Sequence, residues 1–496
     1  MADVDTSTGV DGSTDTTDHR RRRTRNNTLR GRPPVAWLVV GAVLLGLQAG
    51  ALASFVVGLL ADSVAVFAGG GPLGTVTTLL RAAESTAQSL PTLLSRDLVS
   101  NQGYWNGTRW VGTFLGLEPA AAWGVRVALV YLYAFAVAGW AVVGYHLYRT
   151  RYRVADWTPR DDVIGRLRSH TWGIFGLIVV FMFIVMAVFA PTLGPTTVEE
   201  NMRNSYEHEL DYWNADTGEV ETVLVGEANL DSQSRGNNAE RVLPFQYDDY
   251  NRFHPFGTLP NGRDLFTFIA AGSRISLVIG LVSVGLSASV AAALAMITAY
   301  YKNRVDLGAV LVSDAIMAMP QLLLLIMLTS VLSNTWLNDI YSGGFLLAII
   351  FAFTGWTYMW RSLRGPALQV AGRQWVDAAK GFGQRPSMIM RKHILPYITG
   401  YLLIYGSMTL GGAIISIAGL SYLGLGVAPP TPEWGRAINL GQDYVRTGSW
   451  HISLIPGLLI TLVVTGFNAL GDGVRDAIDP QSDAETAEQA GRGGGA

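Results

Sequence analysis

The residue types that enzymes use for bond chemistry occur in this sequence without the spacing that such chemistry requires. A phosphate-binding P-loop needs Gly-x-x-x-x-Gly-Lys-Ser/Thr, but none of Lys302, Lys380 and Lys392 is followed by serine or threonine. The seven histidines show no metal-ligand spacing, cysteine is absent, and no Gly-x-Ser-x-Gly nucleophile elbow occurs. We therefore expect no catalytic residue, no metal, no cofactor and no ATP site in this chain.

One polar stretch, 373–396, has the pattern of a surface that contacts another protein. It contains Trp375-Val-Asp-Ala-Ala-Lys-Gly-Phe-Gly383 and ends with His393-Ile-Leu-Pro396. This pattern predicts a short helix outside the membrane, in which Asp377 caps the helix or pairs with a cation, and small Ala378 and Ala379 let a partner approach. Gly381 and Gly383 are expected to end the helix. A connection that only turns the chain needs about 2–8 residues, so the length favours a docking role.

Two apolar regions contain residues that favour a transport path. Asp314 lies in an apolar stretch before Pro320, and an intramembrane carboxylate costs about 2.5–3.5 kcal/mol, which makes it a functional candidate. The alternative is that Asp314 pairs with a cation or bonds backbone freed near Pro320. Glycines and prolines break the helix in the passages that contain Leu423, Gly424, Gly426, Pro429 and Pro430. They predict either a re-entrant segment at the outer mouth of the path or an ordinary external loop.

The composition indicates a membrane protein that positions these residues on helices. Hydrophobic residues make up 49% of the chain and charged residues 15%, against about 25% charged in soluble domains. About 20 apolar residues cross a bilayer as a helix. Eight stretches meet this length, near 35–60, 122–147, 172–194, 276–299, 308–332, 344–362, 398–420 and 453–472. A ninth, 64–80, contains three consecutive glycines and is expected to lie at the surface.

The distribution of arginine predicts the orientation, because positive charge stays on the cytoplasmic side. With eight spans, the N-terminal arginine cluster, 149–168 and 361–392 fall on one side. Both termini are then cytoplasmic. The stretch 195–264, with 14 acidic residues against five arginines, lies outside. It is expected to form either a small cap or a solvated loop.

The sequence resembles the permease subunits of ATP-binding-cassette (ABC) importers. Asp377-Ala-Ala, Gly383 and Ile394-Leu-Pro396 are similar to the Glu-Ala-Ala…Gly…Ile-x-Leu-Pro signature of that family, with aspartate in place of glutamate. Further passages are similar to the C-type subunits of dipeptide, oligopeptide and nickel importers. They are His254-Pro-Phe-Gly-Thr, Gly262-Arg-Asp264, Ser273-Arg-Ile-Ser276, Leu420-Ser-Tyr-Leu-Gly-Leu-Gly-Val427, Pro429-Pro-Thr-Pro-Glu-Trp-Gly435 and Asn468-Ala-Leu-Gly-Asp-Gly-Val-Arg-Asp476.

The resemblance implies an all-α protein whose last six spans form a type I permease bundle. It implies a B-type permease partner, two ABC ATPase subunits that bind the ATP, an extracytoplasmic solute-binding protein, surrounding membrane lipid and no nucleic acid. The residues that match the coupling signature are Asp377, Ala378, Ala379, Lys380, Gly381, Gly383, Leu395 and Pro396. The implied cargo is a short peptide, with nickel or another small solute as the alternative.

The first two spans depart from the six-span family pattern. We therefore expect a disordered cytoplasmic tail at 1–33, an extra hairpin with an outer loop at 34–150, the third span with the acidic segment at 151–270, the permease core at 271–480 and a disordered tail at 481–496. Two rival interpretations are an ion-coupled secondary transporter, which would work alone, and a membrane scaffold. The first rival needs midplane charges and often internal repeats, but only Asp314 is a clear candidate and no repeat is seen. The scaffold leaves 373–396 unexplained.

Overall fold

The computed structural model describes residues 34–51, 92–153 and 158–478, together with residues 53, 57, 76, 78–83 and 86. The tails at 1–33 and 481–496 lie outside these residues, as does most of the stretch 64–80. The chain forms two compact units, one of residues 1–98 and 128–158 and the other of residues 99–127 and 159–496. Helices dominate both units, as expected for an all-α membrane protein.

The first unit contains helix α2 (Val35–Gly46) and most of helix α5 (Pro119–Leu147), which are apolar along most of their length. Trp37 and Trp140 stack with their ring centroids 4.5 Å apart. Each indole N–H donates to the backbone carbonyl oxygen of the other residue, at 3.0 Å and 2.9 Å. Because an indole N–H needs an acceptor in apolar surroundings, this reciprocal pair fixes α2 against α5.

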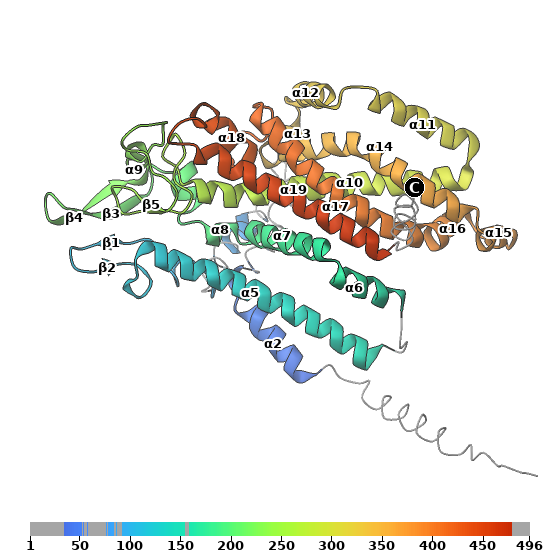
Figure 1. The fold of residues 1–496 in the computed structure, drawn as a ribbon, viewed down its shortest axis with the longest axis horizontal. Coiled ribbons are helices and arrows are strands. Elements are labelled where there is room, and N and C mark those ends of the chain that lie inside the picture. Colours follow the sequence, from blue (N-terminus) through green and yellow to red (C-terminus); the bar gives the residue numbers. More distant parts are fainter. Residues whose placement is uncertain are drawn as a thin grey trace, which may run out of the picture. The chain divides into compact units, whose positions relative to one another are not determined.

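The second unit is a bundle of long helices, built on α10 (Leu265–Tyr301), α14 (Gly344–Ala371), α17 (Leu395–Tyr422) and α19 (His451–Ile478) (Figure 1). α10 packs along α14, and α19 packs against both α17 and α7 (Thr171–Val188). On α10, Ala291, Ala295 and Ala299 follow one another at one-turn spacing and are fully buried. Such small residues let neighbouring helices approach closely where lipid, and not water, surrounds them.

Six described helical segments are long and apolar enough to cross a membrane, and the pair α11 (Asn303–Met317) and α12 (Gln321–Leu332) would make a seventh. The shorter apolar α2 lies in the first predicted span. The prediction of one continuous span at 308–332 is wrong, because α11 and α12 are bent by 86° relative to each other. Pro320 has no N–H and disfavours helical backbone at the residue before it, so a new helix starts at Gln321.

Residues 195–264, the outer domain, fold at one end of the bundle (Figure 1). Strand β3 (Glu209–Asn214) pairs with β4 (Glu219–Leu224), and β5 (Gln246–Tyr247) pairs with β6 (Phe253–His254), both antiparallel. Met202, Ala228 and Leu259 are buried, and Met202 and Leu259 pack into the apolar core of the helix bundle. The alternative of a solvated loop is therefore wrong, since this segment folds and buries apolar residues against the bundle.

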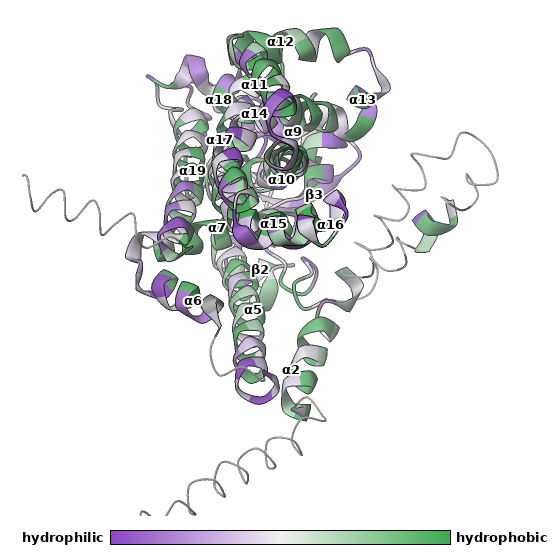
Figure 2. Cartoon of the chain, turned by 90° about the vertical axis from the view of Figure 1, so that its right-hand side faces the viewer, coloured by the Kyte–Doolittle hydropathy of each residue, from purple (hydrophilic) through white to green (hydrophobic). Residues whose placement is uncertain are grey.

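Shorter elements join the long helices. They are β1 (Tyr104–Trp105), β2 (Trp110–Val111), η1 (Phe114–Gly116), η2 (Tyr148–Tyr152), α6 (Pro159–Ser169), α8 (Ala190–Leu193), η3 (Glu199–Arg203), α9 (Val225–Asp231), α13 (Trp336–Asp339), η4 (Ile340–Gly343), α15 (Gln374–Gly381), α16 (Pro386–Ile389), η5 (Met390–Ile394), α18 (Trp434–Gly441) and η6 (Gln442–Tyr444). Figure 2 shows apolar residues along α12 and hydrophilic ones on α6. α15 and α16 lie at the end of the bundle opposite the outer domain (Figure 1).

The contact between α7 and α19 depends on glycine. A β-carbon added to Gly176 would lie 2.4 Å from the backbone nitrogen of Leu470 and 2.6 Å from the carbonyl oxygen of Gly466. We predict that Gly176→Ala forces the helices apart and lowers stability by about 1–3 kcal/mol, the usual effect of overpacking. The matched control is Gly457→Ala on α19, where nothing lies within 4 Å of the added carbon. Thermal unfolding in detergent should separate the two variants, and equal stability would contradict the contact.

Candidate coupling, pathway and outer sites

Helix α15 carries the predicted docking stretch and has one buried and one exposed side. Val376 and Ala379 lie one turn apart and are 0% and 7% exposed, because they pack into a cluster with residues of α10, α14 and α17. Trp375 and Phe382, by contrast, are 51% and 89% exposed. The helix thus attaches to its own bundle by one side and presents large apolar side chains on the other, as an interaction surface does.

The residues predicted to contact a partner divide between these two sides. Asp377 and Ala378 are exposed, and Asp377 Oδ1 accepts a hydrogen bond from Lys380 Nζ at 3.2 Å. Of the two roles predicted for Asp377, capping the helix or pairing with a cation, the pairing is therefore confirmed. The prediction that Ala379 belongs to the exposed surface is wrong, because its methyl group packs against the bundle.

The segment after α15 is helical almost throughout. α15 ends at Gly381, and Gly383 has a left-handed backbone with φ of 71°. The predicted helix end is therefore confirmed. The chain continues through α16 and the π-helical turn η5 into α17, which begins at Leu395 with Pro396 in its first turn. Few irregular residues therefore separate α15 from α17.

Two ion pairs join α11 to α14. Asp314 pairs with Arg361, and Asp306 pairs with Arg364, whose Nε lies 2.6 Å from Asp306 Oδ1. The alternative interpretation of Asp314, pairing with a cation, is therefore the arrangement in the structure. Arg361 also donates from Nε to Ser313 Oγ at 3.1 Å. A role of Asp314 and Pro320 in the pathway remains a prediction.

The stretch after α17 is a non-helical connection that is anchored to the bundle. Gly424 has φ of 77°, and the peptide between Pro429 and Pro430 is cis. The N–H of Ala428 donates to the carbonyl of Ser342 at 2.9 Å. Trp434, at the start of α18, is fully buried and donates from Nε1 to the carbonyl of Ile269 on α10 at 2.7 Å. The chain therefore turns back into the bundle, at the end that carries the outer domain (Figure 1).

Glu433 is a buried carboxyl group at the start of α18. Its side chain accepts from the backbone N–H of Arg436 at 3.2 Å and so caps the helix. Within the described part of the chain, Glu433 Oε1 has no hydrogen-bond partner. Burial disfavours the charged carboxylate, and it raises the pKa of Glu433 to about 7 in spite of the opposing backbone hydrogen bonds.

This burial predicts a pH dependence. Glu433 has an ordinary pKa of 4.5 and a folded pKa of about 7, so the folded state binds more protons between these values and stability falls as pH rises through them. We predict that Glu433→Gln removes this loss of stability with rising pH. Above pH 7 the variant should be more stable than the unaltered chain, by up to about 3 kcal/mol. Unfolding measured at several pH values checks this. Parallel pH profiles for both chains would contradict it.

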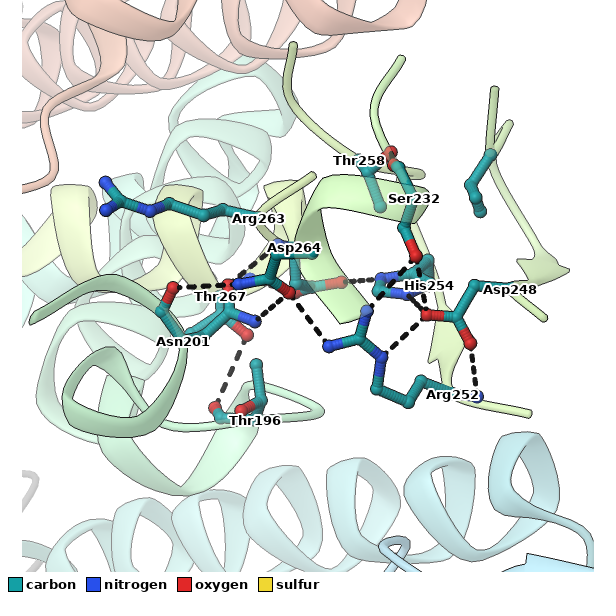
Figure 3. A network of polar contacts seen from close by, with 12 residues as sticks. Thr196, Asn201, Ser232, Asp248, Arg252, His254, Thr258, Arg263, Asp264 and Thr267 are labelled. Atoms are coloured by element: carbon teal, nitrogen blue, oxygen red, sulfur yellow. Dashed lines mark hydrogen bonds and ion pairs between the residues drawn. The ribbon is translucent and has the colours of Figure 1, made fainter. Parts of the chain in front are cut away.

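The outer domain holds a buried polar network that connects it to the start of α10 (Figure 3). His254 lies between two carboxylates, with Nδ1 2.9 Å from Asp264 and Nε2 3.3 Å from Asp248. Arg252 Nε donates to Asp248 at 2.6 Å. Asp264 Oδ1 accepts from the backbone N–H of Thr267 at 2.6 Å and caps α10. Burial lowers the pKa of His254, but the bonds to Asp248 and Asp264 outweigh it and raise that pKa.

Composition and spacing assign no role to this network. His254 and Asp264 stand in passages that carry the family resemblance, whereas Asp248 and Arg252 belong to no motif. The spacing of Asp248 and Arg252 by four residues was an available signal for a local ion pair. Their convergence on His254 depends on the folding of β5 and β6, which spacing does not reveal.

Two families match the chain. The family described as binding-protein-dependent transport system inner membrane component matches residues 290–483. The family described as the N-terminal TM domain of oligopeptide transport permease C matches residues 158–210. Neither match includes residues 1–157, where the extra hairpin is predicted.

Several curated proteins are similar over most of their own length. The oligopeptide transport system permease protein OppC of Bacillus subtilis is 31% identical over 320 residues, which is 64% of this chain and 89% of that protein. The dipeptide transport system permease protein DppC of Alkalihalophilus pseudofirmus is 29% identical over 324 residues, 65% of this chain and 90% of that protein. The glutathione transport system permease protein GsiD of Escherichia coli O1:K1 is 34% identical over 241 residues, 48% and 77% respectively.

Proposed function

The chain belongs to the family of binding-protein-dependent transport system inner membrane components, and from this we propose that it imports short peptides, driven by ATP on separate subunits. The relatives that match it over most of their length are named as dipeptide, oligopeptide and glutathione permeases. Their names favour peptides over nickel as the cargo. The chain itself carries out no bond chemistry in this proposal.

The observation that carries the proposal is the position of α15. This helix lies between α14 and α17, buries Val376 and Ala379 in the bundle, and leaves Trp375 and Phe382 exposed at the end opposite the outer domain. A helix attached in this way moves with the membrane helices on both sides of it. A partner ATPase that binds the exposed side would therefore rearrange α14 and α17 when it closes.

The proposed assembly contains a B-type permease, two ABC ATPase subunits and an extracytoplasmic solute-binding protein. It lies in the cell membrane with both termini and α15 in the cytoplasm and the outer domain outside. The charge distribution supports this orientation, since 361–392 is rich in arginine and lysine while 195–264 is acidic. ATP binds to the ATPase subunits, so this chain needs no cofactor of its own.

Reconstitution in liposomes tests the proposal. The complete assembly should accumulate a radiolabelled dipeptide only when ATP is present on the side of the ATPases. The chain alone should accumulate none, with or without an ion gradient. Uptake by the chain alone would instead favour an ion-coupled secondary transporter. ATP-driven uptake of nickel without uptake of any peptide would favour the other cargo.

A further inference from the structure

The outer domain contains a cavity that the coupling mechanism does not use. Its volume is 320 Å³, at the lower end of the roughly 300–1,000 Å³ range of small-molecule sites. Four parts of the second unit form its walls: the loop and hairpin at 101–112, the stretch at 195–201, strand β3 and the stretch at 250–254. The first of these walls lies outside both family matches, which begin at residues 290 and 158.

The floor of the cavity is rigid. Asn201, His254 and Asp264 line it and are each at most 2% exposed. Asn201 Oδ1 accepts from the backbone N–H of Asp264 at 3.0 Å, and the carboxylate of Asp264 contacts His254 (Figure 3). These side chains hold one another in place, so the cavity is preorganised and a ligand would not have to order its floor.

The side chains that line the cavity offer hydrogen-bond acceptors, while Arg252 already binds neighbouring residues of the protein. Among the described residues, Arg252 is the only arginine or lysine that lines the cavity. Its Nε and one terminal nitrogen bind Asp248 and Asn229 at 2.6 Å and 2.8 Å. At the rim, the carboxylates of Glu209 and Asp211 are exposed on β3.

Deeper in the cavity, the lining adds further acceptors. Asn101 is 6% exposed, and within the described residues its Oδ1 has no hydrogen-bond partner. Glu200 lines the cavity from another side and accepts from Gln102 Nε2 at 3.1 Å. A ligand that satisfies this lining donates hydrogen bonds and carries positive charge.

We propose that this cavity binds an organic ammonium group, and specifically the protonated amino terminus of a short peptide. Glu209 and Asp211 attract and hold the ammonium at the rim, and the cavity behind them accommodates the first residues of the peptide. The choice of a peptide as ligand rests on the proposed function, whereas the preference for an ammonium group rests on the lining. The chain thereby gains a second contact with its cargo, outside the membrane helices.

The test uses the full chain in detergent micelles at low ionic strength, because salt screens exposed charges. Calorimetric titration compares three probes, Ala-Ala, its C-terminal amide and its N-acetyl derivative. We expect similar binding of the first two and a loss of about tenfold or more on acetylation, which removes the ammonium. The double variant Glu209→Gln with Asp211→Asn should bind Ala-Ala about tenfold more weakly. Glu219→Gln, an equal charge change on the paired strand β4 outside the cavity, should bind as the unaltered chain does.

Three results would overturn the inference: no binding of Ala-Ala to the unaltered chain, equal binding of the acetylated peptide, or unchanged binding to the double variant. Its failure is distinguishable from failure of the proposed function. If the reconstituted assembly still takes up dipeptide with ATP while the chain alone binds none, only the cavity inference is lost. If uptake needs no ATPase, the proposed function is lost whatever the titration gives.

Discussion

Phe382→Ala is expected to weaken binding of the partner ATPase by about 30-fold and to abolish most ATP-driven uptake. Phe382 is 89% exposed beside α15, and an aromatic side chain of this size left in water is stabilised once a partner covers it. Truncation of such an anchor removes about 2 kcal/mol or more of binding free energy, which corresponds to about 30-fold in affinity. The measurement is the affinity of purified ATPase for the chain in nanodiscs, together with dipeptide uptake.

The chain offers a matched control at the opposite end of the second unit. Phe245 lies in the outer domain and is 70% exposed, so Phe245→Ala removes a similar apolar area away from α15. It should leave ATPase binding and coupling unchanged. Both variants should unfold at the same temperature as the unaltered chain, since neither side chain is buried. Normal ATPase affinity in Phe382→Ala would show that the exposed side of α15 is not the docking surface.

His254→Ala is expected to destabilise the outer domain by about 3–5 kcal/mol. His254 is 2% exposed and lies between the carboxylates of Asp248 and Asp264. Its removal leaves a cavity and brings two buried carboxylates together without their shared partner, the situation in which breaking a buried pair is most harmful. The effect should reach α10, because Asp264 caps that helix. Limited proteolysis of the outer domain and thermal unfolding both report it.

The contacts of His254 with the two carboxylates also predict that the stability of the outer domain depends on pH. The pKa of His254 is raised above 6.5 in the folded state, so its contribution to stability is fully present below the unfolded pKa and is lost as pH rises through the folded pKa. The His254→Ala chain should not show this loss of stability above pH 6.5. His208→Ala, which alters a half-buried histidine in the same domain, serves as the control and should keep the pH profile. A stable His254→Ala chain would contradict the role of the network.

Local patterns predicted the features whose causes are local. The apolar stretches predicted most of the long helices, and Gly381 and Gly383 predicted the end of α15, because a helix terminus depends on the residues beside it. The two sides of α15 were not predicted, since Ala378 and Ala379 are chemically alike and their burial depends on the neighbouring helices. The sharp bend at Pro320 was also missed, although proline supplied the signal.

Features formed by distant segments could not be read from spacing. The partner of Asp314 is Arg361 on another helix, and the cavity in the outer domain joins residues near 101–112 with β3 and β6. Charge counting over 195–264 predicted a side of the membrane without showing that the segment folds. Its fold comes from a few buried apolar residues and from the network around His254, both of which require the chain to return on itself.

Cross-linking from Ala378→Cys would show whether α15 transmits the motion of an ATPase to the membrane helices. The sequence has no cysteine, so this single thiol reports alone, and Ala379→Cys is the buried neighbour for comparison. We predict that a cytoplasmic reagent labels the first variant much faster than the second. It should also cross-link to the ATPase in proportions that change when ATP is added. Labelling from the outside, or ATP-driven uptake without any cross-link at this position, would contradict the account.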